Sequence, residues 1–343
     1  MSEKPTMAEI ARRAGVNAST VSRAFDANAP VHEATRAKIL KIAADAGYAI
    51  NASARNLRRQ SSEALGLVIP LRHETGQTIS DPFFLQMVAA VCDAAKARGY
   101  DVIINLHGER ELVSQTRLLS SGKADGLIVV GQAEHHQDLC RLGDEFGDLA
   151  RRVVVWGAPA AACNYDLVGS DNVLGGLLAT RHLLELGCRR ILFLGPIDAP
   201  EVDLRRTGYR QAHNEHGLSV DEALTMNVEF RAEQAFAAVT RAIDAGLAFD
   251  GLFAASDVMA MAAIRALAER HISVPENVRI VGYDNIAQTA LTIPSLTTID
   301  QNIHLGGAML VDHLLRKLSG ERVAPAMTPT SLVVRESTVP RSQ

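Results

Sequence analysis

Several patterns that identify large classes of proteins are missing from this 343-residue sequence. No apolar run reaches the roughly 18 residues that a membrane-spanning helix needs, and the N-terminus lacks the apolar stretch of a secretory signal. The four cysteines lie far apart without a C-x-x-C pair, which disfavours a disulfide framework or a zinc site and favours buried free thiols. These absences predict a cytoplasmic protein that makes no contact with a membrane.

Signatures of catalysis and of nucleotide binding are missing as well. The sequence contains no G-x-G-x-x-G after a strand, no G-x-x-x-x-G-K-[ST] and no G-x-S-x-G elbow. His135 and His136 are adjacent, so they would point to different faces of a helix and not share a metal ion. We therefore expect no catalysis, no cofactor and no metal, with an enzyme on the same fold as an alternative because a fold does not fix a function.

The composition that is present favours a globular protein of more than one domain. Hydrophobic residues make up 47% of the chain, which is ordinary for such a protein, and the length exceeds that of one small domain. The net charge of −4 hides an asymmetry: residues 1–60 carry ten Lys/Arg and five Asp/Glu, hence +5, and the remainder carries −9. A basic head on an acidic body is typical of a DNA-binding module joined to a larger domain.

The basic head contains a helix-turn-helix pattern. Thr6 and Glu9 form a capping box at the start of a first helix. Gly15 ends that helix, since glycine adopts the left-handed conformation at little cost, and Asn17 is a good N-cap for a second helix, which turns Val21 inward. The second helix of such a pair enters a DNA major groove. A helical hairpin at the edge of a globular domain is the alternative interpretation.

Two segments connect this pair of helices to the rest of the chain. Residues 33–47 predict a third helix, with Ile39 and Ala43 on its inner face and Gly47 at its end. Residues 51–59, NASARNLRR, can form a short basic helix, and a solvated basic linker is the alternative. We place the boundaries of the headpiece at 1–50, of the linker at 51–62 and of the body at 63–343.

From residue 64 onward, strand-like runs alternate with amphipathic helices, which predicts parallel sheets covered by helices on both faces. The predicted strands are ALGLVIP, YDVIINL, DGLIVV, RVVVW, RRILFLG, DGLFAAS, VRIVGYD and SLTTID. About 270 residues are too many for one doubly wound sheet, so we expect an α/β body of two lobes. The predicted first lobe comprises residues 63–157 and 295–322, and the second comprises residues 163–290 and 323–340.

Polar and aromatic residues gather near the carboxyl ends of these strands, where open parallel sheets bind ligands. Charged side chains can bind the hydroxyls of a sugar, and aromatic rings can stack on its C–H faces. Each residue alone could instead cap a helix or brace a loop, and Asp257 is well placed for that. The candidate effector-binding residues are Phe83, Trp156, Asp171, Arg205, Phe230, Ser256, Asp257, Asp284 and Gln301.

The order of these motifs resembles the lactose-repressor (LacI/GalR) family of transcriptional regulators. The headpiece strings AGVNASTVSRAFD, PVHEATRAKILKIAADAGYAIN and SARNLRRQSS carry the resemblance over residues 6–61. The resemblance continues through the body in the strings VGSDN, HLLELG, RRILFLG, AASD, VGYDN, PSLTTI and TPTSLVVRES. The resemblance implies a helix-turn-helix headpiece followed by a body like the periplasmic sugar-binding proteins, whose chain crosses three times between two lobes.

The resemblance also implies partners and residue roles. A homodimer would bind palindromic double-stranded operator DNA, with Leu57 wedging into the minor groove beside arginines that neutralise phosphates. The implied headpiece contacts are Thr6, Asn17, Ala18, Ser19, Thr20, Ser22 and Arg23, and the implied hinge contacts are Asn51, Ala54, Arg55, Leu57 and Arg58. No leucine heptad follows the last strand-like run, so we expect a dimer and not a tetramer.

Three positions depart from the family pattern. His32 stands where the family usually has a serine, and histidine is a poorer helix cap. Ser256 and Gly157 stand where the lactose repressor has asparagine and aspartate, so a galactoside is not assigned. We expect a sugar as the small-molecule effector. A purine or a sugar phosphate is the alternative, and a sugar-binding protein without a regulatory role is the alternative from another class.

Overall fold

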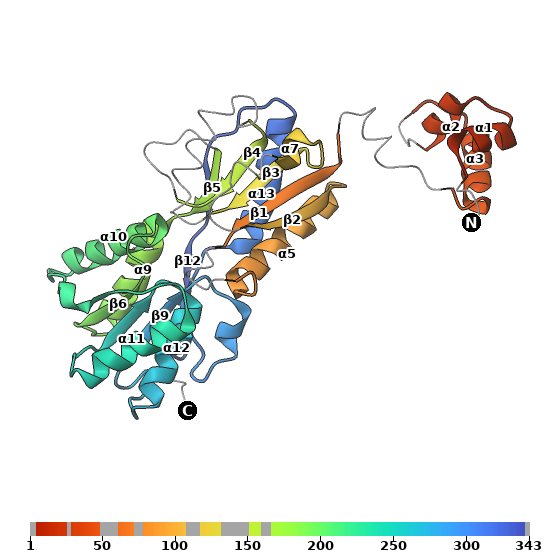
Figure 1. Cartoon of the computed structure of the whole chain (residues 1–343). Helices are drawn as coiled ribbons and strands as arrows, with labels where there is room; N and C mark the ends of the chain where they lie inside the picture. The colour runs from red at the N-terminus through yellow and green to blue at the C-terminus, as the bar shows by residue number, and fades with distance from the viewer. Residues whose placement is uncertain are drawn as a thin grey trace. The chain divides into compact units, whose positions relative to one another are not determined.

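The computed structural model describes residues 5–25, 29–48, 61–71, 78–107, 117–131, 151–158 and 166–339. The chain forms two compact units, residues 1–62 and residues 63–343, which we call the headpiece and the body. The first unit consists of helices, and the second contains two sheets with helices packed against them (Figure 1).

The headpiece is held together by three short helices. Ile10, Val21 and Ile39, one from each helix, are fully buried against one another in its small core. Gly15 ends the first helix with a φ of +71°, a conformation that glycine adopts at little cost. The three helices confirm the predicted helix-turn-helix pattern; they are α1 (Met7–Ala14), α2 (Ala18–Ala24) and α3 (Glu33–Asp45).

Two six-stranded sheets of the same strand order form the centre of the body. The first sheet has the order β11-β5-β4-β3-β1-β2, and the second has the order β12-β10-β9-β8-β6-β7. Each neighbouring pair is parallel except β10 and β12, which are antiparallel. This arrangement confirms the predicted α/β fold of doubly wound, mostly parallel sheets.

The strands of the first sheet are β1 (Ala64–Pro70), β2 (Asp101–His107), β3 (Gly126–Val130), β4 (Val153–Trp156), β5 (Asp166–Ser170) and β11 (Ala326–Thr328). The strands of the second sheet are β6 (Ile191–Gly195), β7 (Thr225–Asn227), β8 (Gly251–Ala254), β9 (Arg279–Tyr283), β10 (Thr297–Asp300) and β12 (Ser331–Val333). We call each sheet with its packed helices a lobe.

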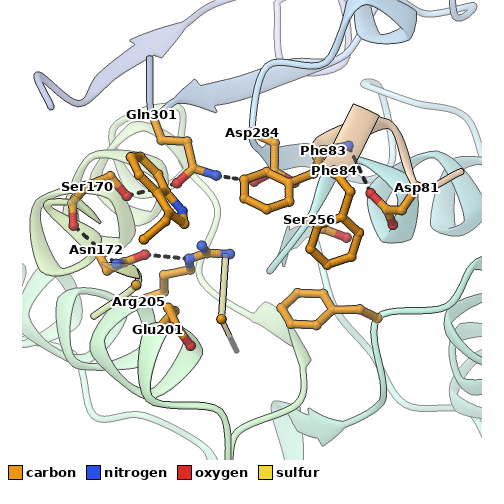
Figure 2. Close-up of a pocket in the computed structure, with 14 residues that line it drawn as sticks. Asp81, Phe83, Phe84, Ser170, Asn172, Glu201, Arg205, Ser256, Asp284 and Gln301 are labelled. Carbon is orange, nitrogen blue, oxygen red and sulfur yellow. Dashed lines mark hydrogen bonds between the residues drawn. The ribbon is translucent and has the colours of Figure 1, made fainter. Parts of the chain in front are cut away.

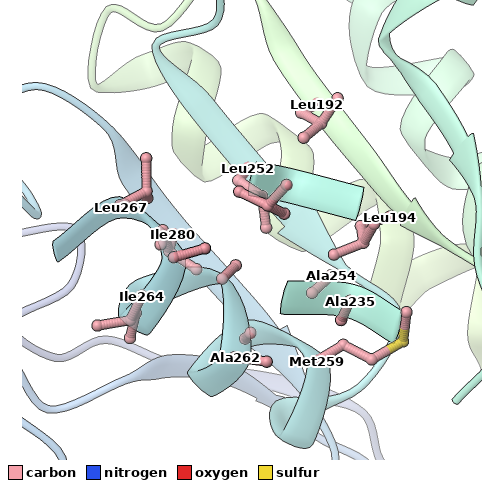
Figure 3. Packing of buried hydrophobic residues seen from close by; sticks show 14 of the residues in the cluster. Leu192, Leu194, Ala235, Leu252, Ala254, Met259, Ala262, Ile264, Leu267 and Ile280 are labelled. Carbon is pink, nitrogen blue, oxygen red and sulfur yellow. The ribbon is translucent and has the colours of Figure 1, made fainter. Parts of the chain in front are cut away.

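Helices cover both lobes because their apolar faces need a sheet to pack on. In the first lobe, α5 (Pro82–Ala97) and α13 (Ile303–Leu318) share a core with β1, β3 and β4, and the short α7 (Arg117–Ser120) lies beyond β2 in the chain. In the second lobe, α11 (Ala232–Asp244) and α12 (Asp257–Ala268) cover one face. Figure 3 shows Ile280 of that sheet beside Ile264 and Leu267 of α12 in this apolar cluster.

The other face of the second sheet is covered by α9 (Asn172–Glu185) and α10 (Pro200–Glu215). These two helices touch backbone to backbone. A Cβ atom added to Gly176 would lie 1.9 Å from the carbonyl oxygen of Arg205, and one added to Gly208 would lie 2.0 Å from that of Val173. Glycine is therefore required at both positions, and the close approach places Arg205 next to the start of α9.

The chain crosses between the lobes later than the sequence predicted at each passage. β5 pairs with β4, so the first lobe extends through Ser170 and does not end at residue 157. β10 pairs with β9 and belongs to the second lobe, and β11 pairs with β5 and belongs to the first. The predicted boundaries fell in polar or small-residue loops, whereas each sheet takes one more short strand before the chain leaves it.

Candidate functional site

A pocket in the body is lined by residues of both lobes and by the segments that connect them. The space between its walls and at its open mouth amounts to about 610 Å³. Seven of the nine predicted residues line it: Phe83, Trp156, Arg205, Phe230, Ser256, Asp284 and Gln301. The other lining residues were not predicted from the sequence: Asp81, Phe84, Gly131, Gly157, Ser170, Asn172 and Glu201.

Arg205 is buried at the base of the pocket and fixed from three sides. Its Nε donates to Oδ1 of Asn172 at 2.9 Å, and its Nη1 donates to the carbonyl oxygen of Ala255 at 2.5 Å. Its guanidinium carbon lies 3.6 Å from the ring centroid of Tyr283, a cation–π contact. Arg205 lies in the second turn of α10, which begins at Pro200. The guanidinium is therefore held in place before any ligand enters.

A second chain of hydrogen bonds joins the pocket to the inter-lobe segments. The hydroxyl of Ser170 donates to Oε1 of Gln301 at 2.9 Å, and Nε2 of Gln301 donates to Oδ1 of Asp284 at 2.6 Å (Figure 2). Nδ2 of Asn172 donates to the carbonyl oxygen of Ser170. Thr328 donates to the carbonyl oxygen of Gln301 at 2.6 Å. Three chain crossings thus meet at Gln301, which itself faces the pocket.

Asp284 combines an unusual backbone with an unusual electrostatic setting. Its φ is +116°, a value that non-glycine residues rarely adopt, and such strain is often stored at functional sites. Burial raises the pKa of Asp284 well above its ordinary value, the nearby Arg205 opposes that rise, and Asp257 and Asp81 add to it. Asp284 therefore holds a proton more tightly than an exposed aspartate does.

The aromatic residues come from opposite sides of the pocket. Phe83 and Phe84 belong to the first turn of α5, and their ring centroids lie 5.4 Å apart in an edge-to-face arrangement. Trp156, at the end of β4, packs its ring against Gly306 of α13, where an added Cβ would lie 2.4 Å from the ring. Phe230 comes from the second lobe. It lies in the loop between β7, which ends at Asn227, and α11.

Asp171 and Asp257 do not line the pocket. Asp171 is exposed and accepts a hydrogen bond from the Leu174 amide as the N-cap of α9. Asp257 is fully buried, accepts hydrogen bonds from the amide of Ile286 at 2.9 Å and the hydroxyl of Thr298 at 2.5 Å, and braces that loop. Burial raises the pKa of Asp257 to about 7. Asp171 therefore caps a helix and Asp257 braces a loop, and these are the two alternative roles that the sequence left open.

Ser256 both lines the pocket and caps a helix. Its hydroxyl oxygen accepts a hydrogen bond from the amide of Met259 at 3.3 Å and so caps α12. Asn172 was missed because it follows the selected Asp171 by one residue, and neighbouring residues at a helix start point in different directions. The string VGSDN was the available signal. Asp81 and Phe84 flank the selected Phe83, whereas nothing in the sequence pointed to Glu201.

The headpiece presents a second candidate surface on α2. Asn17, Ala18, Ser19 and Arg23 are exposed, and Thr20 and Ser22 are half-buried. Oδ1 of Asn17 accepts from the Thr20 amide at 2.9 Å and from the hydroxyls of Ser19 and Thr20, both at 2.7 Å. The predicted hinge contacts Asn51, Ala54, Arg55, Leu57 and Arg58 lie outside the described residues.

The residues that precede α1 and α3 of the headpiece, Thr6 and His32, differ in whether they cap their helices. Thr6 accepts from the Glu9 amide at 3.3 Å, which confirms half of the predicted capping box, while the Glu9 carboxylate pairs with Arg13 instead of reaching back. His32 precedes α3 without a side-chain capping bond, as the sequence predicted.

The described residues can also be searched for a metal site, a membrane-spanning helix and free thiols. Within them, no three His, Cys, Asp or Glu side chains are grouped so that they could hold a metal ion. No helix in the described part of the chain is long and apolar enough to cross a membrane. Cys188 is a buried free thiol and Cys92 a half-buried one. His135, His136, Cys140 and Cys163 lie outside the described residues.

Comparison with known proteins separates the same two units. Residues 6–51 match the bacterial regulatory proteins of the lacI family, and residues 180–338 match a periplasmic binding protein-like domain. The HTH-type transcriptional regulator CelR of Thermobifida fusca is 32% identical over 342 residues, which cover 97% of this chain and 98% of CelR. The ribose operon repressor of Escherichia coli is 29% identical over 317 residues, and the match covers 92% of this chain and 93% of that repressor.

Solved structures show the same relationship. A complex of the regulator CelR with cellobiose superposes with a TM-score of 0.71 at 28% identity and covers 97% of this chain and 99% of its own. The lac repressor dimer bound to operator and the anti-inducer ONPF shares the fold, with a TM-score of 0.86 at 24% identity over 98% of this chain and 99% of its own. Together with the helix-turn-helix and the two-lobed body, these matches show that the chain belongs to the LacI family of bacterial regulatory proteins and is a DNA-binding transcriptional regulator controlled by a small-molecule effector.

Proposed function

We propose that this regulator is a repressor that binds a roughly palindromic operator as a homodimer and changes its operator affinity when a sugar occupies the pocket of the body. The observation that carries the proposal is the hydrogen-bonded chain from Asp284 through Gln301 to Ser170, which links the pocket to the segments between the lobes. A ligand that binds these groups favours one arrangement of the lobes over another. Such a regulator acts in the cytoplasm, where its DNA lies.

The DNA-binding part of the proposal rests on the exposed face of α2. Ala18, Ser19 and Arg23 are exposed on one helix of a positively charged headpiece. A recognition helix of this kind reads base edges in the major groove, while Thr6, Asn17, Thr20 and Ser22 contact the groove or its phosphates. Asn51, Ala54, Arg55, Leu57 and Arg58 complete the interface in our proposal, with Leu57 entering the minor groove at the operator centre.

The effector part rests on the chemistry of the pocket. Carboxyl, amide and guanidinium groups bind vicinal hydroxyls with paired hydrogen bonds, and Phe83 and Phe230 offer rings for the C–H faces of a sugar. The cellobiose complex of the related CelR supports a sugar as the effector class. Two lobes joined by short segments can close on such a ligand, and the shift in operator affinity cannot exceed the ligand's preference between the two states.

Footprinting of the full chain on genomic fragments, with and without candidate sugars, tests this function. We expect a protected site with twofold symmetry, an affinity that falls steeply with salt through counterion release, and a change in affinity when an effector is added. Arg23→Ala should cost about 1–3 kcal/mol of operator binding. The absence of any protected site at low salt, with and without sugars, would refute the proposal.

A further inference from the structure

Helix α2 of the headpiece is too short to hold its own position. It has seven residues, and isolated helices shorter than about 12 residues are marginal in water. Val21 and Ala24 are its buried residues, so packing fixes one face, and the opposite face exposes Ser19 and Arg23. The direction in which the exposed face is turned therefore depends on what holds the two ends of the helix.

The two ends of α2 are held in different ways. At the N-terminal end, Oδ1 of Asn17 accepts from the amide of Thr20 at 2.9 Å, as a helix cap does. At the C-terminal end, Phe25 is in the right-handed conformation and not in the left-handed one with which many helices end. The last carbonyl groups of a helix have no partner within it, so those of α2 need donors from elsewhere in the chain.

Arg36 of α3 supplies such donors. Its Nη1 donates to the carbonyl oxygen of Ala24, the last residue of α2, at 2.7 Å. Its Nη2 donates to the carbonyl oxygen of Ala29, in the segment between the two helices, at 2.7 Å. Both bonds come from one planar guanidinium, whose N–H groups form a rigid fork. One side chain thus fixes the end of α2 relative to α3 and to the segment that joins them.

The position of Arg36 within its own helix supports the same role. Arg36 is the fourth residue of α3, near the positive N-terminal end of that helix, where a cation is unfavourable. At the C-terminal end of α2 the same cation is favourable, because the last carbonyl groups carry partial negative charge. The charge of Arg36 therefore stabilises α2 and not the helix to which Arg36 belongs.

This contact affects recognition through Arg23. Arg23 is exposed and directly precedes Ala24, whose carbonyl group Arg36 holds. Nε of Arg23 donates to the carbonyl oxygen of Ser19 at 3.4 Å, so the side chain runs along the exposed face of α2. A recognition group must be held within about 0.5 Å of its productive position. A small rotation of the last turn of α2 would therefore misdirect Arg23.

We propose that Arg36 is a positioning residue for DNA recognition, which fixes the C-terminal end of α2 and thereby directs Arg23 at its base. The inference rests on the proposed DNA-binding face of α2. Phosphate contacts give affinity for any sequence, whereas base contacts give specificity. Loss of the two Arg36 bonds should therefore weaken binding to the preferred sequence and leave binding to unrelated DNA nearly unchanged.

Arg36→Lys tests the proposal, because lysine keeps the charge and carries its donors on one nitrogen instead of a planar fork. The unmodified full chain selects its preferred duplex from a randomised palindromic library, and a shuffled duplex of the same length is the non-specific probe. We expect the variant to bind the preferred duplex about 10-fold more weakly, within the range of one bidentate base contact. Its affinity for the shuffled duplex should stay within about twofold. Equal losses on both duplexes would overturn the proposal.

A double-mutant cycle with Arg23→Ala tests whether Arg36 acts through Arg23. Arg36→Lys should reduce the preference for the selected duplex about 10-fold when Arg23 is present and less than about twofold when it is absent. Fully additive losses would mean that Arg36 acts on another group, and the assignment would be wrong.

Arg36→Gln separates positioning from a direct phosphate contact, since glutamine removes the charge. Lys38→Gln is the matched control, because Lys38 is exposed on the same helix and the change in charge is equal. We expect the salt dependence of binding to change by the same amount in both variants, with loss of specificity in Arg36→Gln alone. A salt slope that falls by about 1 in Arg36→Gln only would identify a phosphate contact and contradict the proposal.

Hydrogen exchange on the full-length variants shows whether the headpiece stays folded. We expect faster exchange confined to the end of α2, with α1 and α3 as protected as in the unmodified chain. If only Arg36→Lys loses protection throughout, the cycle is carried out with Arg36→Gln. Loss of protection across all three helices in both variants would make Arg36 a support of the headpiece core and overturn the proposal.

The selection step separates failure of this inference from failure of the proposed function. An unmodified chain that enriches no duplex from the library would refute the proposed operator binding itself. A chain that enriches a duplex, with Arg36→Lys and Arg36→Gln equal to it in specificity, would refute only the role of Arg36.

Discussion

The two lobes of the body share one strand order but give the pocket different chemistry. The second lobe supplies Asn172, Arg205, Ser256 and Asp284, and hydrogen bonds within the protein already hold most of them in place. The first lobe supplies mainly the rings at the start of α5 and the end of β4. Equal topology therefore does not imply an equal share in recognition.

The difference suggests a division of labour between the lobes. Polar groups that are fixed before binding lose little entropy when the ligand arrives, so they set affinity and specificity. An apolar wall gains free energy when it covers the ligand and excludes water, so the first lobe contributes mainly through closure. Gln301, which hydrogen-bonds to both sides, connects the two processes.

The largest effect should follow from Arg205→Ala in the second lobe. The substitution removes the donor to Asn172 and Ala255 and the cation over Tyr283, and truncating a buried hydrogen-bonded charge typically costs about 2–5 kcal/mol of binding. We expect effector binding to disappear from calorimetry, while the ligand-free protein still binds operator. Effector affinity within threefold of the unmodified protein would show that the second lobe does not dominate recognition.

A smaller effect should follow from Asp284→Asn, which keeps the acceptor for Gln301 and removes the charge. Hydrogen bonds to charged groups contribute about 1.5–3 kcal/mol, and we expect a loss in that range for the effector at a pH above the raised pKa of Asp284. The unmodified protein should bind the effector more weakly as the pH falls through the raised pKa of Asp284, since protonation removes the carboxylate. In the variant this part of the pH dependence should vanish.

The same carboxyl group affects stability in the opposite direction. Because the pKa of Asp284 is higher in the folded protein than its ordinary 3.8, the folded state holds the proton more tightly. Its contribution to stability is complete below the unfolded pKa and is lost as the pH rises through the folded pKa. Urea unfolding of the ligand-free protein at several pH values should show a smaller decline in Asp284→Asn, and Asp257, whose pKa is raised to about 7, contributes to the decline that remains.

The apolar wall should contribute less per residue. Phe83→Leu in the first lobe keeps an apolar side chain and removes the ring, so the effector should lose about 0.5–1.5 kcal/mol, the usual contribution of an aromatic contact. Phe230→Leu in the second lobe is the matched variant. Stopped-flow measurements should assign the loss in Phe83→Leu mainly to faster dissociation, because the first lobe acts after the ligand has bound. A loss larger than that in Asp284→Asn would contradict the division between the lobes.

Local signals explain what the sequence predicted well. The headpiece helices start and end at side chains that act within one turn, such as Thr6, Gly15 and Asn17. The strands are short apolar runs, and the ends of parallel strands meet at one edge of a sheet, which is why Arg205, Ser256 and Asp284 were found. These features depend on neighbours in sequence or on a general rule of the fold.

Features that depend on contacts between distant elements were missed. The lobe boundaries depend on which sheet accepts β5, β10 and β11, and a strand of three to five residues carries no mark of its partner. Glu201 lines the pocket because α10 packs closely on α9 and because position 157 in the other lobe lacks a side chain. Neither condition can be read from the residues around Glu201.

The smallest effect should follow from Asp81→Asn in the first lobe. Asp81 lines the pocket, but its Oδ1 accepts from the amide of Phe83 at 2.9 Å and caps α5. Asparagine caps a helix about as well as aspartate does, so the fold should be preserved. Burial already raises the pKa of Asp81, so loss of its charge relieves an unfavourable setting, and the affinity for the effector should change by less than about 0.5 kcal/mol. Calorimetry beside Asp284→Asn measures the difference directly. Equal losses in the two variants would mean that the first lobe also recognises the ligand through a carboxylate, and the contrast between a polar and an apolar lobe would not hold.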